Sequence, residues 1–325
     1  MKYYIVFDLE WNQSAVGKEA SLESLPFEIF EIGAVKLNGN REKVSEFHEI
    51  IRPCVYCQMH FAISEVTHAS MEELQRYGRP FPDVMKDFLE WCGKDYIFCT
   101  WGSMDLTELQ RNMAYHGMKI PFQRPLLFYD VQKLFSLLYS DGKVRASLDD
   151  AVCFFDIIVQ APFHRAMEDA EYTSRVLAEM EFEQIRQYFS VDYYRLPSTQ
   201  EEEFTLEFPD YSKYVSRTFA TKEEAMADKQ VTDMICYKCH RMLRKKIRWF
   251  SYSQKFYLCL AICPEHGYVK GKIRMKRSED GSIFAIKTQK FVYGEDVDLV
   301  AKKKEETKIR RLERNRIRKS QKRRS

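Results

Sequence analysis

The sequence lacks any long hydrophobic run. Nowhere among its 325 residues does a stretch approach the roughly 18 to 20 consecutive apolar residues that a membrane span needs. The opening stretch, MKYYIVFDLEWN, reaches acidic residues too early to be a secretory signal peptide. We therefore expect a cytoplasmic protein with no membrane partner.

The sequence also lacks an internal repeat of fixed period, so a repeat array is not expected. Its nine cysteines would permit disulfides in a secreted chain, but without an export signal reduced thiols or metal ligation are the better expectation. Hydrophobic residues make up 45% of the chain and aromatic residues 14%. This composition predicts a globular protein with one large domain and a smaller one.

Charges of the two signs are unevenly distributed along the chain, although the formal net charge is only +3. Residues 1–235 hold 24 basic and 39 acidic residues, a net charge of −15. Residues 236–301 hold 14 and 6, a net charge of +8, and residues 302–325 hold 13 and 3, a net charge of +10. An acidic body repels a polyanion, so we expect the basic C-terminal part to attract one.

Hydrophobic periodicity predicts an α/β fold for the first part of the chain. Strand-like runs at 3–11, 27–37 and 45–53 predict a three-stranded meander, because the turn-forming Asn-Gly-Asn separates the second run from the third. A short apolar strand is expected over 95–101, and helical spacing predicts helices over 70–93, 104–117, 130–140, 147–156 and 167–189. Strands followed by alternating helices and a strand indicate a sheet flanked by helices.

Composition changes after residue 190 and suggests four parts. Residues 1–190 form the α/β domain, and residues 191–230 mix proline, acidic and polar residues with little periodicity, which is typical of a linker or an appended peptide. Hairpin-like strands predict a small β domain over 231–298. The basic tail over 299–325 is more typical of a solvated or disordered arm than of a segment that recognises a specific nucleic-acid sequence.

Two carboxylates share one face of the first predicted strand. Side chains alternate along a strand, so Asp8 and Glu10 point to one side and Leu9 to the other. Like charges on one face repel each other unless a cation lies between them. A divalent cation is therefore the first hypothesis, against the simpler interpretation of an exposed strand end.

Two later segments add titratable residues. WGSMDLTEL places Asp105 just after a strand, in the first turn of a helix, where sites at the edge of an α/β sheet gather. HRAMEDA places His164 before a helix and Asp169 within its first turns. Taken singly, these residues are an ordinary helix-start acid, a surface histidine and a solvated charge.

Taken in order, FDLEW, WGSMDLTEL and HRAMEDA resemble the three motifs of the DEDDh exonucleases in the DnaQ-like, RNase H-like superfamily. EIFEIGAVKL and IRPCVYCQMHFAISEVTHAS resemble the family's second strand and middle segment. The Trp-Gly pair before Asp105 is most similar to the histone-mRNA and siRNA 3′-exonuclease branch, which includes the bacterial KapD-like proteins. The resemblance implies an RNase H-like mixed sheet flanked by helices, and stepwise 3′-to-5′ release of nucleoside 5′-monophosphates.

The resemblance also assigns roles to five residues. Hard oxygen ligands suit Mg²⁺ or Mn²⁺, and four carboxylates can hold two such ions about 4 Å apart; these would be Asp8, Glu10, Asp105 and Asp169. His164 would accept the proton of the attacking water, since an imidazole titrates near neutral pH.

The sequence departs from the family pattern at two points. The usual His-Asn-Ala is His164-Arg165-Ala166 here, which is expected to alter loop packing or to add a phosphate contact, and the family's Thr-Gly is Thr67-His68. Trp11 and Trp101 lie beside the motifs and are candidates to stack a terminal base. The alternative is that both indoles fill the core.

Cysteine and histidine spacing in the second part predicts a structural zinc site. The pattern Cys-x₂-Cys-x₂₃-Cys-x₂-His places two ligand pairs on turns with hairpin strands between them, as in a zinc ribbon. The expected ligands are Cys236, Cys239, Cys263 and His266. Cys259 and His240 are the residues most able to displace one of them, and reduced buried cysteines without metal are the alternative. A small β-rich unit would gain much of its stability from the ion.

Basic residues around these cysteines alternate with aromatic ones. Cations for phosphates and rings for bases are the ingredients of single-strand binding, and the rings concerned are Trp249, Phe250, Tyr252, Phe256 and Tyr257. A core face of a sheet would explain the same rings. The expected partner is single-stranded nucleic acid, RNA rather than DNA, and the tail adds salt-sensitive affinity.

Three functions remain in competition. The first is a metal-dependent 3′-to-5′ exonuclease, which is favoured because all five charged groups are present. The second is a catalytically silent binding or adaptor protein on an exonuclease scaffold, and the third is a DNA-directed proofreading exonuclease.

Overall fold

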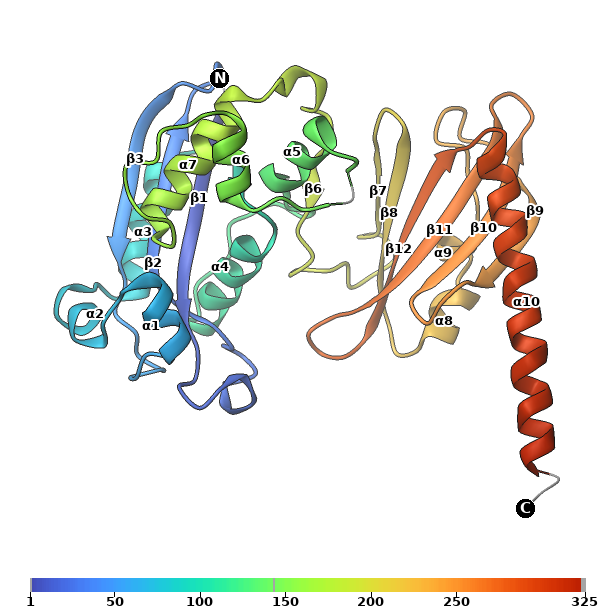
Figure 1. Ribbon diagram of the computed structural model, residues 1–325, viewed down its shortest axis with the longest axis horizontal. Helices are drawn as coiled ribbons and strands as arrows, with labels where there is room; N and C mark the ends of the chain where they lie inside the picture. The colour runs from blue at the N-terminus through green and yellow to red at the C-terminus, as the bar shows by residue number, and fades with distance from the viewer. Residues whose placement is uncertain (1, 143, 323–325) are drawn as a thin grey trace. The chain divides into compact units, whose positions relative to one another are not determined.

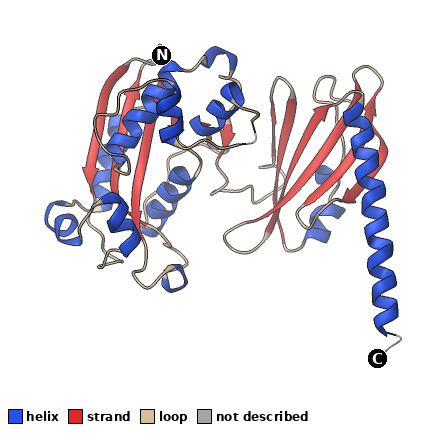
Figure 2. Ribbon diagram, in the orientation of Figure 1, coloured by secondary structure: helices blue, strands red, loops and turns tan. Residues whose placement is uncertain are grey.

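The structure is a computed structural model that describes residues 2–142 and 144–322. It divides into two compact units, Met1–Arg195 (unit 1) and Leu196–Ser325 (unit 2). Figure 1 labels their helices and strands, and Figure 2 colours both units by secondary structure.

Unit 1 is built on a mixed six-stranded sheet with the strand order β3-β2-β1-β4-β5-β6. β1 pairs antiparallel with β2, which pairs antiparallel with β3, and β1 pairs parallel with β4 on its other side. The predicted meander and the mixed α/β fold are therefore confirmed. The strands are β1 (Tyr3–Asn12), β2 (Glu28–Leu37), β3 (Lys43–Ile50), β4 (Tyr96–Thr100), β5 (Leu127–Asp130) and β6 (Ser190–Val191).

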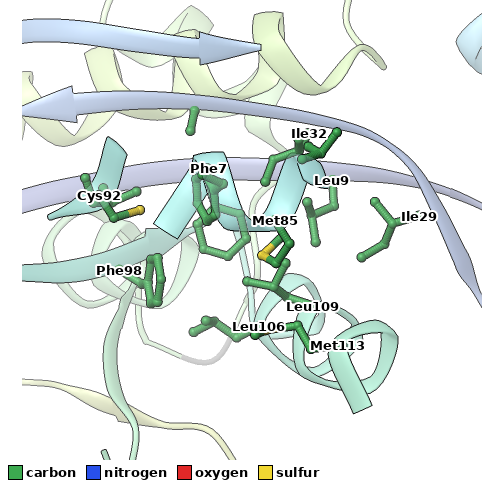
Figure 3. Packing of buried hydrophobic residues seen from close by; sticks show 14 of the residues in the cluster. Phe7, Leu9, Ile29, Ile32, Met85, Cys92, Phe98, Leu106, Leu109 and Met113 are labelled. Carbon is green, nitrogen blue, oxygen red and sulfur yellow. The ribbon is translucent and has the colours of Figure 1, made fainter. Parts of the chain in front are cut away.

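Helices cover both faces of this sheet. The helices of unit 1 are η1 (Lys18–Ala20), α1 (Phe61–Thr67), α2 (Met71–Tyr77), α3 (Phe81–Cys92), α4 (Met104–Tyr115), α5 (Val131–Tyr139), α6 (Leu148–Phe154), α7 (Ala166–Glu179) and η2 (Phe182–Gln184). Phe7 and Leu9 of β1 pack against α3 and α4, as Figure 3 shows, whereas Val6 faces α5, α6 and α7. Because β1 is buried on both faces, closely packed neighbours fix the positions of the polar groups at its end.

The helix predicted over 70–93 is two helices, α2 and α3. Between them, Gly78 has an extended backbone, and the N–H of Arg79 donates to the carbonyl of Ile50 beside β3 at 3.0 Å. Arg79 precedes Pro80, and a residue before proline disfavours the helical conformation. Pairing with a neighbouring strand thus replaces helical hydrogen bonds here.

The helix predicted over 167–189 also ends early, at Glu179. The guanidinium of Arg41, in the turn between β2 and β3, donates to the carbonyls of Leu177, Ala178 and Met180 at 2.9, 3.1 and 2.7 Å. A cation that satisfies the last carbonyls of a helix stabilises that end. The chain then turns through η2, so that Phe182 and Ile185 join the core.

Unit 2 is an antiparallel six-stranded sheet with the order β7-β8-β12-β11-β10-β9. Its strands are β7 (Phe204–Glu207), β8 (Tyr211–Phe219), β9 (Arg244–Ser251), β10 (Phe256–Cys263), β11 (Gly267–Arg277) and β12 (Ile283–Phe291). The short helices α8 (Lys222–Ala227) and α9 (Lys229–Thr232) contribute Ala225 and Val231 to a core with Ile273 and Met275 of β11.

Two sequence-based predictions for this unit are wrong. Residues 191–230 are not a linker or an appended peptide: they contain β7, β8 and α8 and the start of α9, and Tyr214 and Val215 of β8 are buried. The cysteine-bearing segment 231–298 is accordingly part of a larger sheet rather than a separate small ribbon, since β8 pairs with β12 along most of its length. Pairing partners distant in sequence supply the order that local periodicity did not reveal.

The basic tail is helical where the structure describes it, in α10 (Glu295–Lys322), and residues 323–325 lie outside the described residues. Val297 and Val300 at its start pack with Leu260 of β10, and the helix runs beside β9 and β10 (Figure 1). Among the described helices, none combines the length and the apolar character required to cross a membrane.

Candidate active site and cysteine–histidine cluster

A close approach between α7 and the sheet creates the acidic site of unit 1. Gly33 of β2 lies opposite Asp8 in the β1–β2 register. A Cβ at Gly33 would lie 2.2 Å from the backbone nitrogen of Met167 and 2.3 Å from the carbonyl of Ala166. Glycine is therefore required for α7 to pack this tightly, and the contact brings the first turn of α7, with Asp169, over the end of β1.

Three of the predicted carboxylates converge at this point. Asp8, Glu10 and Asp169 each offer an oxygen, and these oxygens all lie within 4.8 Å of one another. Oδ2 of Asp169 accepts a hydrogen bond from the backbone N–H of His164 at 3.2 Å, whereas its Oδ1 is buried and has no hydrogen-bond partner in the described part of the chain. A buried oxygen without a donor fits a cation ligand, because an unsatisfied polar atom is costly otherwise.

The electrostatics of the group support the same interpretation. Burial raises the pKa of Asp8 well above its usual range, and the charges of Asp105, Asp169 and Glu10 raise it further. Burial and the neighbouring carboxylates raise the pKa of Glu10 to about 8. Burial likewise raises the pKa of Asp105 to about 7 and that of Asp169 to about 6. Full ionisation of the group at neutral pH therefore needs a counter-cation.

Asp105, in the first turn of α4, lies beside the three-residue group rather than within it. Its side chain is buried, and its charge is the strongest of those that raise the pKa of Asp8. It also lines the same cavity as Asp8, Glu10 and Asp169. The structure thus brings all four predicted carboxylates to one end of the sheet.

That cavity has a volume of about 530 Å³. Besides the four carboxylates, its lining includes Trp11 and Trp101, and also Asp130, Gln132 and Arg145, which sequence reasoning missed. Nη1 of Arg145 donates to the two carboxylate oxygens of Asp130 at 3.1 and 3.2 Å. Asp130 ends strand β5, at the carboxyl edge of a parallel strand, where sites of α/β sheets gather. No strand was predicted there from the sequence.

The two tryptophans contact both the core and the cavity. The ring of Trp11 packs against Phe27 with centroids 5.8 Å apart, and that of Trp101 packs against Phe135 at 6.2 Å. The indole N–H of Trp101 is buried and has no hydrogen-bond partner within the described residues. Core packing and base stacking are therefore not mutually exclusive for these side chains.

His164 is the one predicted residue of this site that does not line the cavity. It is exposed, and its backbone has a φ of 71°, a left-handed conformation. Through its backbone N–H it holds Asp169, as described above. The proposed role of its imidazole stays a prediction that requires the side chain to turn toward the cavity.

Arg165, the departure from the family pattern, belongs to an ion-pair network centred on the buried carboxylate of Glu31. Glu31, opposite Glu10 in the β1–β2 register, accepts from Nε of Arg165 at 3.0 Å and contacts Nε2 of His48 at 2.7 Å. The hydrogen bonds from His48 and Arg165 hold the pKa of Glu31 low despite its burial, and the bond to Glu31 raises the pKa of His48. Arg165 thus ties the start of α7 to β2 next to the carboxylates.

Comparison with known proteins identifies the family. The exonuclease family model (RNase T) matches residues 5–177, which is more than half of the chain. This chain belongs to the exonuclease family. The matched segment contains Asp8, Glu10, Asp105, His164 and Asp169.

Three individual relatives each share less than 30% sequence identity with this chain. The chain is 29% identical over 177 residues to DNA polymerase III PolC-type of Bacillus subtilis strain 168, a match that covers 54% of this chain and 11% of the polymerase. Among solved structures, the nuclease domain of 3′hExo, a DEDDh family member, bound to rAMP is 19% identical, with a TM-score of 0.48 and coverage of 59% of this chain and 96% of that chain. A full-length 3′-exonuclease is 18% identical, with a TM-score of 0.48 and coverage of 58% and 85%.

Outside the exonuclease segment, unit 2 brings together the four predicted zinc ligands, Cys236, Cys239, Cys263 and His266. Sγ of Cys239 lies 3.6 Å from Sγ of Cys263, and Nδ1 of His266 lies 3.6 and 3.5 Å from the sulfurs of Cys236 and Cys263. With zinc bonds of about 2.3 Å to sulfur and about 2.0 Å to nitrogen, tetrahedral ligands lie about 3.5 to 3.8 Å apart. The group therefore fits a zinc ion in both chemistry and spacing.

The two alternative ligands do not join this group. Cys259 of β10 is buried in the hydrophobic core of unit 2, and this burial raises the pKa of its thiol to about 12. His240 is exposed, and its Nδ1 lies 3.8 Å from Oε1 of Glu207.

The aromatic rings of this region separate onto two faces of the sheet. Trp249 and Tyr257 pack against the core that contains α8 and α9, and the indole N–H of Trp249 donates to the carbonyl of Thr232 at 2.6 Å. Phe250 packs with the start of α10. Of the five rings considered for base contact, Tyr252 and Phe256 are left beside cations: Nζ of Lys303 lies 4.8 Å from the Tyr252 ring centre, and Nζ of Lys272 lies 4.4 Å from that of Phe256.

Proposed function

We propose that this protein is a divalent-metal-dependent exonuclease that shortens single-stranded nucleic acid from its 3′ end and releases nucleoside 5′-monophosphates. The convergence of Asp8, Glu10 and Asp169 within 4.8 Å, with an unpartnered buried oxygen on Asp169, carries this proposal. Within the described residues, none of the three is ion-paired to a side-chain cation, so a purely structural role leaves their repulsion unexplained. The exonuclease family match supports the same chemistry.

The carboxylates would hold the metal ions, and the cavity would hold the terminal nucleotide. When bound, divalent ions lower the pKa of a coordinated water and stabilise charge on the leaving 3′-oxygen. Asp8, Glu10 and Asp169 would ligate them, with Asp105 beside these three. His164 would accept the proton of the water after its imidazole turns inward.

Two further groups would orient the substrate. Trp11 and Trp101 line the cavity, so a terminal base would stack against an indole there. Arg145 is about half exposed, with 48% of its side chain accessible, and is already oriented by Asp130. Its guanidinium would pair with a phosphate oxygen of the strand.

RNA is the proposed substrate, because the Trp101-Gly102 pair before Asp105 resembles the RNA-trimming branch of the DEDDh enzymes. A DNA-directed, proofreading-type exonuclease is the second candidate, since a DNA polymerase III of PolC type shares 29% identity with this chain. A silent adaptor is disfavoured, because such a protein has no need to retain all five charged groups.

The proposal is tested with end-labelled single-stranded RNA and DNA in Mg²⁺, in Mn²⁺ and without added divalent ions. We expect stepwise shortening from the 3′ end, faster on RNA, that depends on the added ion. Asp8→Asn should lower the rate at least about a hundredfold, because loss of an outer-shell partner alone costs about ten- to a hundredfold, and His164→Ala should also lower it. Asp83→Asn, which alters an exposed acid of α3, is the matched control. Full activity in Asp8→Asn would overturn the proposed site.

We also propose that Cys236, Cys239, Cys263 and His266 hold one structural zinc ion. Protein purified without chelator should contain about one zinc per chain, and Cys263→Ser should lose it. Cys259→Ser is the control and should retain the metal. Less than about half a zinc per chain in the parent protein would count against this site.

A further inference from the structure

The two faces of β11 carry different side chains. Val269, Gly271, Ile273 and Met275 are buried, and Ile273 and Met275 belong to the core with α8 and α9. Because side chains alternate along a strand, the intervening residues point to the opposite face. These residues are Lys270, Lys272, Arg274 and Lys276, named here the basic row. Their Cα atoms follow one another at intervals of about 6.7 Å.

Aromatic rings of the neighbouring strands lie beneath this row. Phe256 of β10 is opposite Arg274, and its ring centre lies 4.4 Å from Nζ of Lys272 and 5.8 Å from the guanidinium of Arg274. On the other side, Phe284 of β12 is opposite Lys276, whose Nζ lies 5.7 Å from the ring centre. The rings position the cations without neutralising their charge.

In the part of the chain that the structure describes, the middle of the row has no acidic partner. Within the described residues, Lys272 and Arg274 form no ion pair, whereas Lys270 lies 3.7 Å from Asp296 of α10. Partial desolvation of the ammonium group lowers the pKa of Lys272, and the charges of Arg274, Lys270 and Lys303 lower it further. Elsewhere in unit 2, Arg217 is neutralised by both Glu203 and Asp228. Crowded cations without a counter-ion mark a surface that favours an anion.

A pocket at the end of β11 includes two cations of the row in its lining. It has a volume of about 290 Å³ and is lined by five cationic residues together with Met275 and Ile283. The cations are Lys222, Lys255, Arg274, Lys276 and Arg277. Nζ of Lys222 donates to the carbonyl of Gln254 at 3.1 Å, which holds one cation in place. Arg274 and Lys276 are members of the basic row, so the row and the pocket share two cations.

We propose that the basic row and this pocket bind the sugar-phosphate backbone of single-stranded nucleic acid. A single line of cations follows one phosphate backbone, and Phe256 and Tyr252 beside it offer ring surface to unpaired bases. The surface belongs entirely to unit 2, whereas the carboxylate cavity belongs to unit 1. The inference deepens the proposed exonuclease function, on which it rests, by naming a second place where the substrate strand is held.

Binding is measured separately from cleavage, so that the two proposals can fail independently. The full-length chain carrying Asp8→Asn is titrated into fluorescein-labelled oligouridine and oligothymidine of about 16 nucleotides, the upper end of the site sizes of single-strand binding folds. Fluorescence anisotropy is recorded between about 50 and 200 mM salt. Cleavage by the parent chain is assayed in parallel.

The test variant is Lys272→Ala with Arg274→Ala, and the matched control is Lys86→Ala with Lys94→Ala. Both control lysines are exposed residues of unit 1, and neither forms an ion pair within the described residues. We expect the test variant to bind about tenfold more weakly and its salt slope to fall by about 1.4, since each lost phosphate contact on a single strand removes about 0.7. The control should bind like the parent, and Lys272→Arg should retain binding.

Three outcomes would overturn the inference: unchanged binding by the test variant, equal weakening by test and control variants, or no affinity of the parent chain for either oligonucleotide. The last would point to an acidic protein surface as the partner instead. Circular dichroism melting of the test variant separates a loss of binding from a loss of folding. If the parent binds through the row but cleaves nothing, the exonuclease proposal fails and this inference stands.

Discussion

Unit 1 and unit 2 each place like charges on alternate residues of a strand, with opposite consequences. Asp8 and Glu10 of β1 lie under α7 and converge with Asp169, so their charges meet within 4.8 Å and their pKa values are strongly raised. Lys272 and Arg274 of β11 are exposed and spaced along the strand.

The comparison shows that burial and spacing decide what a like-charged strand binds. Closely packed, partly buried carboxylates need a compact, dense charge, which a divalent cation supplies. Exposed cations in a line suit an extended polyanion, whose charges are distributed in the same way. The same alternation of side chains thus supports a proposed metal site in one unit and a proposed nucleic-acid surface in the other.

The largest expected effect comes from removing one carboxylate charge from the acidic group of unit 1. Glu10→Gln keeps the shape of the side chain and removes one metal-binding charge, so the rate of nucleotide release should fall at least about a hundredfold. Glu72→Gln, at an exposed position of α2, is the control and should retain the parent rate. Equal rates for the two variants in a single-turnover assay would contradict the role of Glu10.

The next effect tests whether positive charge beyond the sheet adds to the basic row. Deletion of residues 302–325 removes 13 basic and 3 acidic residues while leaving Val297 and Val300 packed on β10. Affinity for single-stranded RNA should fall about tenfold, and its salt dependence should become shallower. Replacing Glu305, Glu306 and Glu313 with Gln should shift affinity in the opposite direction. An unchanged salt slope after the deletion would mean that α10 makes no phosphate contact.

A third prediction concerns Arg165, the cation nearest to the carboxylates in sequence. Arg165→Gln leaves Glu31 paired with His48 alone and loosens the start of α7. It also raises the pKa of Glu10 further, so that protons compete more strongly with the metal for this carboxylate. The Mg²⁺ concentration for half-maximal activity should rise about tenfold, with partial rescue by Arg165→Lys. Arg175→Gln, which breaks a surface pair with Glu171 on the same helix, should not shift it. A loss of rate with no change in the Mg²⁺ requirement would exclude this positioning role.

The smallest effect is on stability and follows from the raised pKa values. A carboxyl group whose pKa is higher in the folded state, such as Glu10 at about 8 against an ordinary 4.5, binds more protons when folded than when unfolded. Stability without added Mg²⁺ should therefore fall as pH rises between these two values, by about 5 °C in Tm. Saturating Mg²⁺ should flatten this slope. Differential scanning calorimetry at several pH values checks it, and a metal-free Tm that rises over this range would contradict the assignment.

Much of the site was predictable, because the relevant patterns are local or follow a recognisable order. Alternation placed Asp8 and Glu10 together, and the family resemblance supplied Asp105 and Asp169. Arg145 and Asp130 were missed, since nothing near them in sequence links them to the other motifs; only the parallel order of β1, β4 and β5 brings their strand ends to one cavity.

The extent of the second unit was mispredicted for a related reason. Residues 204–219 have little amphipathic contrast of their own, and their order comes from pairing with β12. Val215 of β8 pairs with Ile286 of β12, about 70 residues further along the chain. The sequence around β8 gives no local sign of so distant a partner.

Side-chain periodicity alone determines which residues share a strand face in this protein: Asp8 with Glu10, and Lys272 with Arg274. The spacing of Cys236, Cys239, Cys263 and His266 likewise predicts two pairs of metal ligands, each on a turn. Tertiary structure alone decides that Gly33 admits α7 to within contact of the sheet and that Arg41 ends that helix. The physical reason is that the backbone geometry of a strand decides within a few residues which side chains share a face. The contacts of Gly33 and Arg41 with α7 instead depend on packing between segments that are more than a hundred residues apart in the chain.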